Sequence, residues 1–371
     1  MKRVDALMTD AVLRGDIPGA VVVVGRKGRV VYRRAFGASQ LVPKKLPMSE
    51  DLMFDMASLT KPLATATSIL ILVEQGRISL SEEVRDFVPG FGPPPDAEGQ
   101  PPEEPVRIWH LLTHTSGLPA YLPPTEGEGG PLAGDIESLI GGSATTSRLA
   151  VLIAGLPRTD PPGRVFRYSC LGYITLAHIL QHVTGRSLDE FAAENVFKPL
   201  GMKHTMFAPP PNLRDKCVPT QLLGGEPLRG IVHDPLARLQ GGVSGNAGLF
   251  STANDLAVFC QMMLDKGTHN GRRILSPLSV ERMTEVFPGA SFAGRGLGWD
   301  LDSGYASCGG DLFGPKSYGH TGYTGTSVWI DPETRMFLIF LTNRVHPDDQ
   351  GSIAVLRSRL ANVVAASMVG K

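Results

Sequence analysis

The sequence has no net charge, no long apolar run and no closely spaced cysteines, and each absence excludes a class of protein. Its 371 residues include 36 basic and 36 acidic side chains, so it offers no long-range attraction for nucleic acid or an anionic membrane. No stretch approaches the roughly 18 uncharged apolar residues of a membrane-spanning helix. The four cysteines form no CxxC pair, which argues against structural disulfides and fits a reducing cytoplasm. We therefore expect a cytoplasmic protein that acts on a small molecule and binds neither nucleic acid nor membrane.

Charged side chains also interrupt the N-terminal segment MKRVDALMTDAVLRGDIPGA. Asp5, Asp10 and Arg14 break any apolar run there, so the segment is not a secretory signal. The alternation of polar and apolar residues predicts a short amphipathic helix instead.

Runs of β-branched and apolar residues at both ends of the chain predict two hairpins. The four strands are expected at residues 21–24, 30–32, 326–330 and 336–341. Their turns are Arg26-Lys27-Gly28 and residues 331–334, and a final helix is expected over about 351–368. This order predicts an α/β fold in which both chain termini build one antiparallel sheet, flanked by helices, with a mostly helical lobe inserted.

We expect one domain over residues 1–371. Its α/β lobe would comprise about 1–60 plus 270–371, and its helical lobe about 61–269. Helices within that lobe are expected at 62–74, 172–184, 188–195 and 254–264. A proline-rich stretch, 88–106, and a glycine-rich stretch, 123–147, are interpreted as surface loops that shape the pocket, although interdomain linkers have a similar composition.

Ser58 and Lys61 stand three residues apart in MASLTKPL, where a helix is expected to begin. Pro62 suits the first turn of a helix, because its missing N–H costs little there. Residues i and i+3 share a helix face, so the Lys61 amine can reach the Ser58 hydroxyl, and the helix N-terminus favours an oxyanion. Taken alone, the spacing is common, and a capping serine beside a solvated lysine is the more frequent explanation of it.

A serine nucleophile needs a base, and the chain has no G-x-S-x-G elbow with which to place a histidine. Tyr168 lies between a Pro-Gly turn and a helix expected to start near Leu171. Ionising a tyrosine or deprotonating a lysine at neutral pH requires its pKa to fall by about three units, which corresponds to roughly 4 kcal/mol. Packing Tyr168 against the Lys61 cation is an arrangement that supplies such a shift. Alone, Tyr168 would fit a core position.

The segment GHTGYTG contributes a third element, His320-Thr321-Gly322, at the edge of a predicted strand. Gly322 would let the backbone approach a ligand closely, and the N–H of Tyr323 would face Ser58 as an oxyanion donor. A glycine-rich β-turn is the structural alternative.

Together and in this order, these elements resemble the serine β-lactamase and penicillin-binding-protein superfamily, most closely the class C β-lactamase branch and its family VIII-type carboxylesterases. The blocks LLTHTSGLP, PGRVFRYSCLGY, FKPLGMKHTMF, GGVSGNAGLFSTANDLAVF and GHTGYTGTSVWIDPE look like blocks of this family. The resemblance implies a β-lactamase/transpeptidase-like fold with Ser58 as nucleophile. Lys61 would take the serine proton or hold Tyr168 as the phenolate that does. Tyr168 would then protonate the leaving group and activate water, with the N–H groups of Ser58 and Tyr323 as the oxyanion hole.

Two departures from the family pattern concern the substrate. His320 stands where these β-lactamases usually have lysine, and Cys170 where they have asparagine. A histidine of pKa near 6.5 is only about a quarter protonated at pH 7, which weakens an anchor for a β-lactam carboxylate. Cys170 is a weak donor, or simply a small apolar residue facing the lobe interior.

These departures favour a serine hydrolase of the carboxylesterase type, acting on short-chain acyl esters. Cys170, His320, Thr321 and Gly322 would contact its substrate. The alternatives within the same mechanism are a class C-like β-lactamase or a D-amino-acid peptidase. A catalytically silent ligand-binding or sensor protein is the alternative without turnover.

His110 and His114 have an i, i+4 spacing that can bind zinc. No glutamate follows His110 and no third ligand is evident, so we expect no metal and no cofactor. The pair is interpreted as the C-terminal part of a helix that lines the cleft and is capped near Gly117. No motif indicates an oligomeric state.

Overall fold

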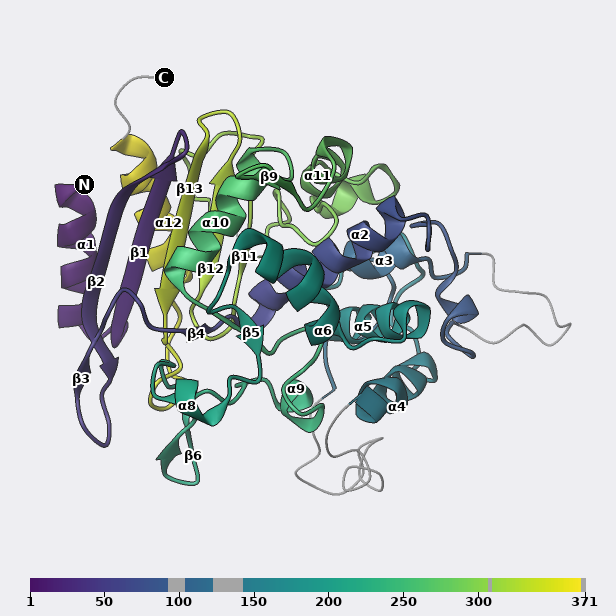
Figure 1. The fold of residues 1–371 in the computed structure, drawn as a ribbon, viewed down its shortest axis with the longest axis horizontal. Coiled ribbons are helices and arrows are strands. Elements are labelled where there is room, and N and C mark those ends of the chain that lie inside the picture. The colour runs from purple at the N-terminus through teal and green to yellow at the C-terminus, as the bar shows by residue number, and fades with distance from the viewer. Residues whose placement is uncertain (93–103, 123–142, 306–308, 368–371) are drawn as a thin grey trace, which may run out of the picture.

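A six-stranded antiparallel sheet joins the two ends of the chain (Figure 1). The structure is a computed structural model that describes residues 1–92, 104–122, 143–305 and 309–367. The strand order is β11-β12-β13-β1-β2-β3. These strands are β1 (Gly19–Arg26), β2 (Arg29–Gln40), β3 (Leu46–Pro47), β11 (Tyr318–Thr321), β12 (Ser327–Asp331) and β13 (Met336–Thr342). The predicted α/β fold, with one sheet built from both termini, is confirmed.

Strand β1 is buried on both of its faces, which explains its uninterrupted run of valines. Val22 and Val24 pack in a cluster with α1 (Lys2–Leu13) and α12 (Ala354–Ala366) on one side of the sheet. Val21 and Val23 belong to the main core on the other side. The sheet is thus a middle layer between two sets of helices.

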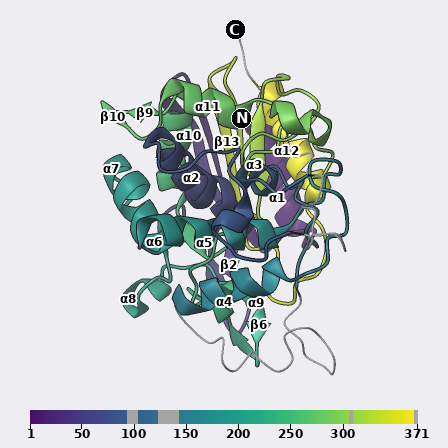
Figure 2. The same ribbon diagram turned by 90° about the vertical axis from the view of Figure 1, so that its right-hand side faces the viewer.

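The helical part of the molecule covers the second face of the sheet (Figure 2). Its longer helices are α2 (Thr67–Glu74), α4 (Ser143–Ala154), α5 (Cys170–Thr184), α10 (Ala253–Leu264) and α11 (Pro277–Thr284). The shorter ones are α3 (Ile108–Leu112), α6 (Leu188–Ala192), α7 (Lys198–Leu200), α8 (Pro211–Arg214) and α9 (Pro235–Leu239). Short 3₁₀-helices occur at Val84–Asp86 and Pro288–Ala293.

Small sheets connect these helices to the rest of the molecule. One consists of β4 (Phe54–Asp55), β8 (Leu249–Ser251) and β5 (Met206–Phe207), and it joins three segments that are distant in sequence. The other two are the pairs β6 (Leu222–Leu223) with β7 (Glu226–Pro227) and β9 (Thr268–His269) with β10 (Arg272–Arg273).

Three helical segments differ from the prediction. The helix expected over 62–74 begins as a π-helix, Lys61–Ala66, and becomes α2 only at Thr67. The helix expected over 188–195 is α6 followed by a π-helical turn, Ala193–Phe197. The glycine-rich stretch expected to be a loop up to residue 147 has already entered α4 at Ser143, ahead of the apolar residues that begin at Leu149.

The predicted division into two lobes stays a prediction. Helix α10, expected in the helical lobe, packs against β1, β12 and β13. Residues 93–103 and 123–142, which hold most of the two predicted surface loops, lie outside the described residues, as does Cys308. The other three cysteines are free thiols. No helix in the described residues has both the length and the apolarity needed to cross a membrane.

Candidate active site

Ser58 lies directly after a strained residue, Ala57, which follows β4 by two positions. Ala57 has a left-handed backbone (φ 45°), which is unusual for a residue with a Cβ. Its N–H donates to Asp55 Oδ1 at 2.8 Å, while Asp55 Oδ2 accepts the N–H of His233 at 2.7 Å. The buried Asp55 carboxylate therefore fixes the turn that presents Ser58, a role that no motif indicated.

Ser58 and Lys61 meet as their spacing predicts. Ser58 is the middle residue of a 3₁₀-helix, Ala57–Leu59, in which side chains three residues apart are nearly eclipsed. Lys61 Nζ donates to Ser58 Oγ at 2.9 Å.

Lys61 is fully buried and surrounded by acceptors. Besides Ser58 Oγ, its ammonium donates to the main-chain oxygen of Asn246 at 2.9 Å and to Cys170 Sγ at 3.4 Å. Burial lowers the pKa of Lys61, but Cys170 and Tyr168, which become negative when they ionise, outweigh burial and raise the pKa above its ordinary value. Three acceptors, one of them a main-chain carbonyl that can only accept, match the three N–H donors of an ammonium, so we interpret Lys61 as a cation.

Tyr168 lies beside this cation. Lys61 Nζ is 5.1 Å from the centroid of the Tyr168 ring. The ring lies between that of Tyr305, stacked at 4.5 Å and 12°, and that of His114 at 4.3 Å. Aromatic neighbours thus hold the ring in place next to Lys61.

Cys170 is the first residue of α5 and touches the site directly. Burial raises the pKa of its thiol, and the nearby Lys61 charge only partly offsets this effect. A neutral thiol accepts from Lys61 instead of offering the donor that an asparagine would provide. Cys170 therefore contacts Lys61, and its contact with substrate stays a prediction.

The segment after β11 packs against the turn that holds Ser58. A Cβ on Gly322 would lie 2.6 Å from the Met56 oxygen and 2.2 Å from Thr326 Oγ1. Thr326 Oγ1 itself donates to the Met56 oxygen at 3.1 Å. Gly322 thus permits close contact with the protein's own backbone, whereas we expected close contact with a ligand.

Tyr323 turns its side chain away from this contact. Its hydroxyl donates to Asp349 Oδ2 at 3.0 Å, and the ring is largely exposed. Only its main-chain N–H is left to act at the site.

His320 is neutral, contrary to our expectation of partial charge. It is buried, and burial together with the positive charges of Arg295 and Lys61 places its pKa well below the ordinary value. Its Nδ1–H donates to the oxygen of Thr321 at 2.8 Å, which leaves Nε2 as an unprotonated acceptor. The position therefore carries no cationic anchor.

Arg295 places a positive charge near His320. Its side chain is 1% exposed and forms an ion pair with the equally buried Asp300 at 3.5 Å. Among the described residues, Nε and Nη2 of Arg295 find no hydrogen-bond acceptor. Sequence reasoning did not find Arg295 because no motif around it specifies what it faces.

The Nδ1 atoms of His110 and His114 each accept a hydrogen bond from a backbone N–H. His110 accepts the N–H of Arg107 at 2.8 Å, and His114 accepts that of Ser169 at 3.1 Å. Helix α3 ends at Leu112, earlier than expected, because His114 adopts a left-handed conformation (φ 59°). Within the described residues, no group of three or more histidine, cysteine, aspartate or glutamate side chains could hold a metal.

Comparison with known proteins extends over nearly the whole chain. The family model described as "Beta-lactamase" matches residues 3–362. An "N-acetylmuramyl-L-alanine amidase" of Bacillus subtilis is 31% identical over 378 residues, covering 93% of this chain and 81% of the relative. A "Putative D-alanyl-D-alanine carboxypeptidase" of Salmonella enteritidis is 33% identical over 358 residues, covering 89% and 79%.

Solved structures show the same fold. The structure of "EstCE1, a hydrolase with promiscuous acyltransferase activity" has a TM-score of 0.74 at 25% identity and covers 98% of both chains. A penicillin-binding protein homologue from Caulobacter crescentus also has a TM-score of 0.74, at 20% identity, over 99% of this chain and 97% of that one.

Proposed function

The chain belongs to the β-lactamase family of serine hydrolases, and from this premise we propose that it is a carboxylesterase that cleaves short-chain acyl esters through an acyl-enzyme on Ser58. Weak hydrolysis of β-lactams is compatible with the same site. We also propose a reducing cytoplasm as its compartment, in keeping with the three free cysteines.

The charge of Lys61 favours one of the two roles left open for it, which is to support Tyr168 rather than to take the serine proton itself. An ammonium that already donates to Ser58, Asn246 and Cys170 has no lone pair with which to accept a proton. Tyr168, whose ring lies beside this cation, would then act as the base that takes the proton of Ser58 as Oγ attacks the acyl carbonyl.

The same phenol would return that proton to the alkoxide that leaves. Water then replaces the alcohol. Tyr168 takes a proton from water as the hydroxide adds to the acyl carbon, and passes it to Ser58 Oγ when the acid departs.

We assign the oxyanion hole to the N–H groups of Ser58 and Tyr323. The close packing of Gly322 on Met56 and Ala57 supports this assignment, because it brings the two segments together. Neither N–H has a hydrogen-bond acceptor in the described part of the chain.

The neutral state of His320 is the observation that favours esters. A β-lactam or a peptide C-terminus presents a carboxylate, which a neutral imidazole with an unprotonated Nε2 does not attract. Cys170, which accepts from Lys61, also lacks the donor for an amide side chain. An ester of a small uncharged acid requires neither group.

A D-amino-acid carboxypeptidase is the second candidate, and Arg295 favours it. This buried guanidinium has two nitrogens without described acceptors and lies near enough to His320 to lower its pKa. A substrate carboxylate that reached it would form charge-assisted hydrogen bonds. The Salmonella relative's name points the same way.

Three substrate classes separate these proposals. We would incubate the protein with p-nitrophenyl acyl esters, a chromogenic cephalosporin and a D-Ala-D-Ala peptide, with Ser58→Ala and Tyr168→Phe as variants. Ester turnover that exceeds the other two activities and disappears in Ser58→Ala supports the esterase. Peptide turnover that is lost when Arg295 is replaced would favour the carboxypeptidase over the esterase. Acylation without turnover of any class would indicate a sensor.

A further inference from the structure

We propose that the side chains of Ser244 and Asn246 are positioning residues, because a buried chain of hydrogen bonds passes through them and fixes the carbonyl that holds the Lys61 ammonium. This inference rests on the proposed acyl-enzyme chemistry at Ser58, and the experiment below separates the two.

The chain has four links of normal length. Thr146 Oγ1 donates to Gln240 Oε1 at 3.1 Å, and Gln240 Nε2 donates to Ser244 Oγ at 2.8 Å. Ser244 Oγ then donates to Asn246 Oδ1 at 2.7 Å. Asn246 closes the chain with its main-chain oxygen, which accepts from Lys61 Nζ at 2.9 Å.

Burial makes each link directional. Gln240, Ser244 and Asn246 are at most 1% exposed, so bulk water does not compete for their hydrogen bonds. Both protons of Gln240 Nε2 are used, one on Ser244 and one on the Leu236 oxygen at 3.1 Å. Ser244 has a single proton and gives it to Asn246. The orientation of the Asn246 carboxamide is therefore set by the residues before it.

The backbone around Asn246 needs such support. Its segment, GGVSGNAG, contains four glycines, of which Gly241, Gly242 and Gly248 have positive φ. Glycine allows many conformations in the absence of other constraints, at a cost of about 1 kcal/mol each. Packing on α5 and a hydrogen bond from Thr65 Oγ1 to the Gly245 oxygen at 2.7 Å hold the residue before Asn246, and side-chain hydrogen bonds hold Asn246 itself.

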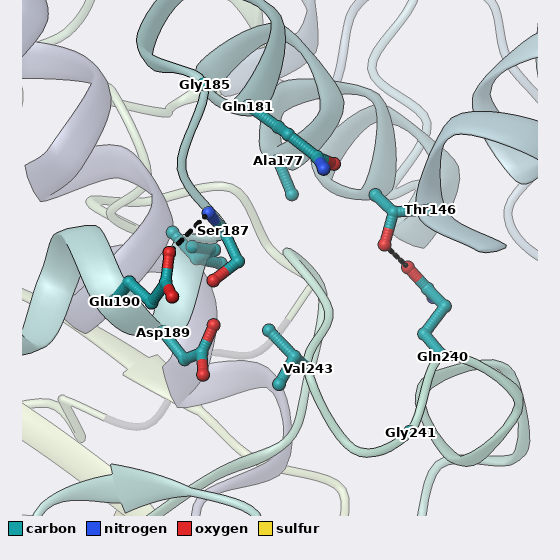
Figure 3. A pocket seen from close by; sticks show the side chains of 11 residues that line it. Thr146, Ala177, Gln181, Gly185, Ser187, Asp189, Glu190, Gln240, Gly241 and Val243 are labelled. Atoms are coloured by element: carbon teal, nitrogen blue, oxygen red, sulfur yellow. Dashed lines mark hydrogen bonds between the residues drawn. The ribbon is translucent and has the colours of Figure 1, made fainter. Parts of the chain in front are cut away.

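One side of the segment borders a cavity instead of packed core. Gln240, Gly241 and Val243 line a cavity of about 360 Å³ together with residues of α5 and α6 (Figure 3). Figure 3 shows the Thr146 hydroxyl directed at the Gln240 carboxamide in the lining of this cavity. Because side chains do not fill this space, the hydrogen-bond chain holds the segment where packing cannot.

Loss of the hydrogen-bond chain would leave the Asn246 carbonyl, one of the three acceptors of Lys61, free to move. The ammonium would keep its hydrogen bonds to Ser58 and Cys170 but would no longer be held in its position relative to Ser58 Oγ. Misplacement of a reacting group by about 1 Å can cost roughly 100-fold in rate. Fewer acceptors also stabilise the ammonium less, so the pKa of Lys61 would fall.

Ser244→Ala and Asn246→Ala test the proposal, with Ser68→Ala as the matched control. Ser68 is also a fully buried serine, but its hydroxyl has no described partner. We would measure the rate of Ser58 labelling by a fluorophosphonate, and kcat, KM and the pH profile with p-nitrophenyl butyrate. We expect labelling and kcat to fall about 10- to 100-fold, KM to change less than about twofold, and the basic limb to move to lower pH. Ser68→Ala should change none of these.

Gln240→Met provides a second test that does not depend on a tightly packed site. Methionine keeps the length of glutamine at the cavity wall but cannot donate to Ser244, so we expect labelling to slow about three- to tenfold. Wild-type labelling rates and an unmoved basic limb in folded Ser244→Ala and Gln240→Met proteins would overturn the proposal. Wild-type labelling without ester turnover would overturn the esterase instead, and the labelling comparison would still decide the role of the chain.

Discussion

The N–H of Ala57 donates to the carboxylate of Asp55, and this bond holds the residue before Ser58 in a left-handed conformation. Both oxygens of Asp55 accept backbone N–H groups, one from Ala57 and one from His233, which lies far along the chain. The turn that presents the serine is therefore tied to a distant loop by one ionised side chain.

Asp55→Asn should change how stability depends on pH. Burial raises the pKa of Asp55 from 3.8 to about 6, so the folded protein binds this proton more tightly than the unfolded chain. The Asp55 contribution is therefore fully present below about pH 4 and is lost as pH rises through about 6, by up to about 3 kcal/mol. Urea unfolding of both proteins from pH 4 to pH 7.5 measures this. The free energy of unfolding of wild type minus that of the variant should decrease across this range, and a constant difference would contradict the raised pKa.

Replacement of His320 with glutamine should leave the shape of the pH profile unchanged. His320 is neutral throughout the working range because burial and the Arg295 and Lys61 charges disfavour its cation. Asp55, whose pKa is raised to about 6, holds the turn that presents Ser58, so we expect an acid limb of kcat/KM near pH 6. This limb should persist in His320→Gln and change only in Asp55→Asn. The measurement is kcat/KM for a p-nitrophenyl ester between pH 5 and pH 8. If the limb vanished in His320→Gln, the histidine would be the ionising group, and the conclusion that His320 is neutral would be wrong.

The ring of Tyr305 should contribute to rate through its stacking on Tyr168. The two rings lie 4.5 Å apart at 12°, although Tyr305 is 58% exposed. An aromatic pair contributes about 0.5–1.5 kcal/mol, so Tyr305→Ala should lower kcat roughly two- to twelvefold. Tyr305→Phe keeps the ring and serves as the control, with kcat close to wild type. A faster Tyr305→Ala enzyme would mean that the ring obstructs the site.

The parts of the structure that local sequence determines could be predicted. Lys27 and Gly28 both have positive φ, as a tight hairpin turn requires, and the β-branched residues around them form β1 and β2. Likewise, Ser58 and Lys61 are neighbours because of their spacing alone. The pattern could not show the π-helix at Lys61–Ala66, since apolar periodicity does not distinguish it from an α-helix.

The residues that support the site could not be predicted, because their roles depend on long-range contacts. Asp55 acts through an N–H of His233, and Asn246 through a carbonyl that reaches Lys61. Arg295 looks in sequence like any exposed arginine but is fully buried. The protonation of His320 was misjudged for the same reason, since the spacing along the chain does not indicate which charges surround a side chain.

Gly322→Ala should disable the site through contact with the nucleophile's own turn. The new methyl group would lie 2.6 Å from the Met56 oxygen and 3.3 Å from the Ala57 Cβ, which are backbone-anchored atoms that cannot easily give way. The segment that carries Tyr323 would have to move away from Ser58. We expect a loss of about 1–3 kcal/mol in stability and at least tenfold slower labelling of Ser58 by a fluorophosphonate.

Gly155→Ala is the control for this substitution, because a Cβ there meets only the Leu152 oxygen, at 3.7 Å. Its stability should change by less than about 0.5 kcal/mol and its labelling rate not at all. The comparison requires thermal melts of both variants beside the labelling rates. If Gly322→Ala lost stability but still labelled at the wild-type rate, the oxyanion hole would not depend on this contact. The N–H of Tyr323 would then be the wrong donor.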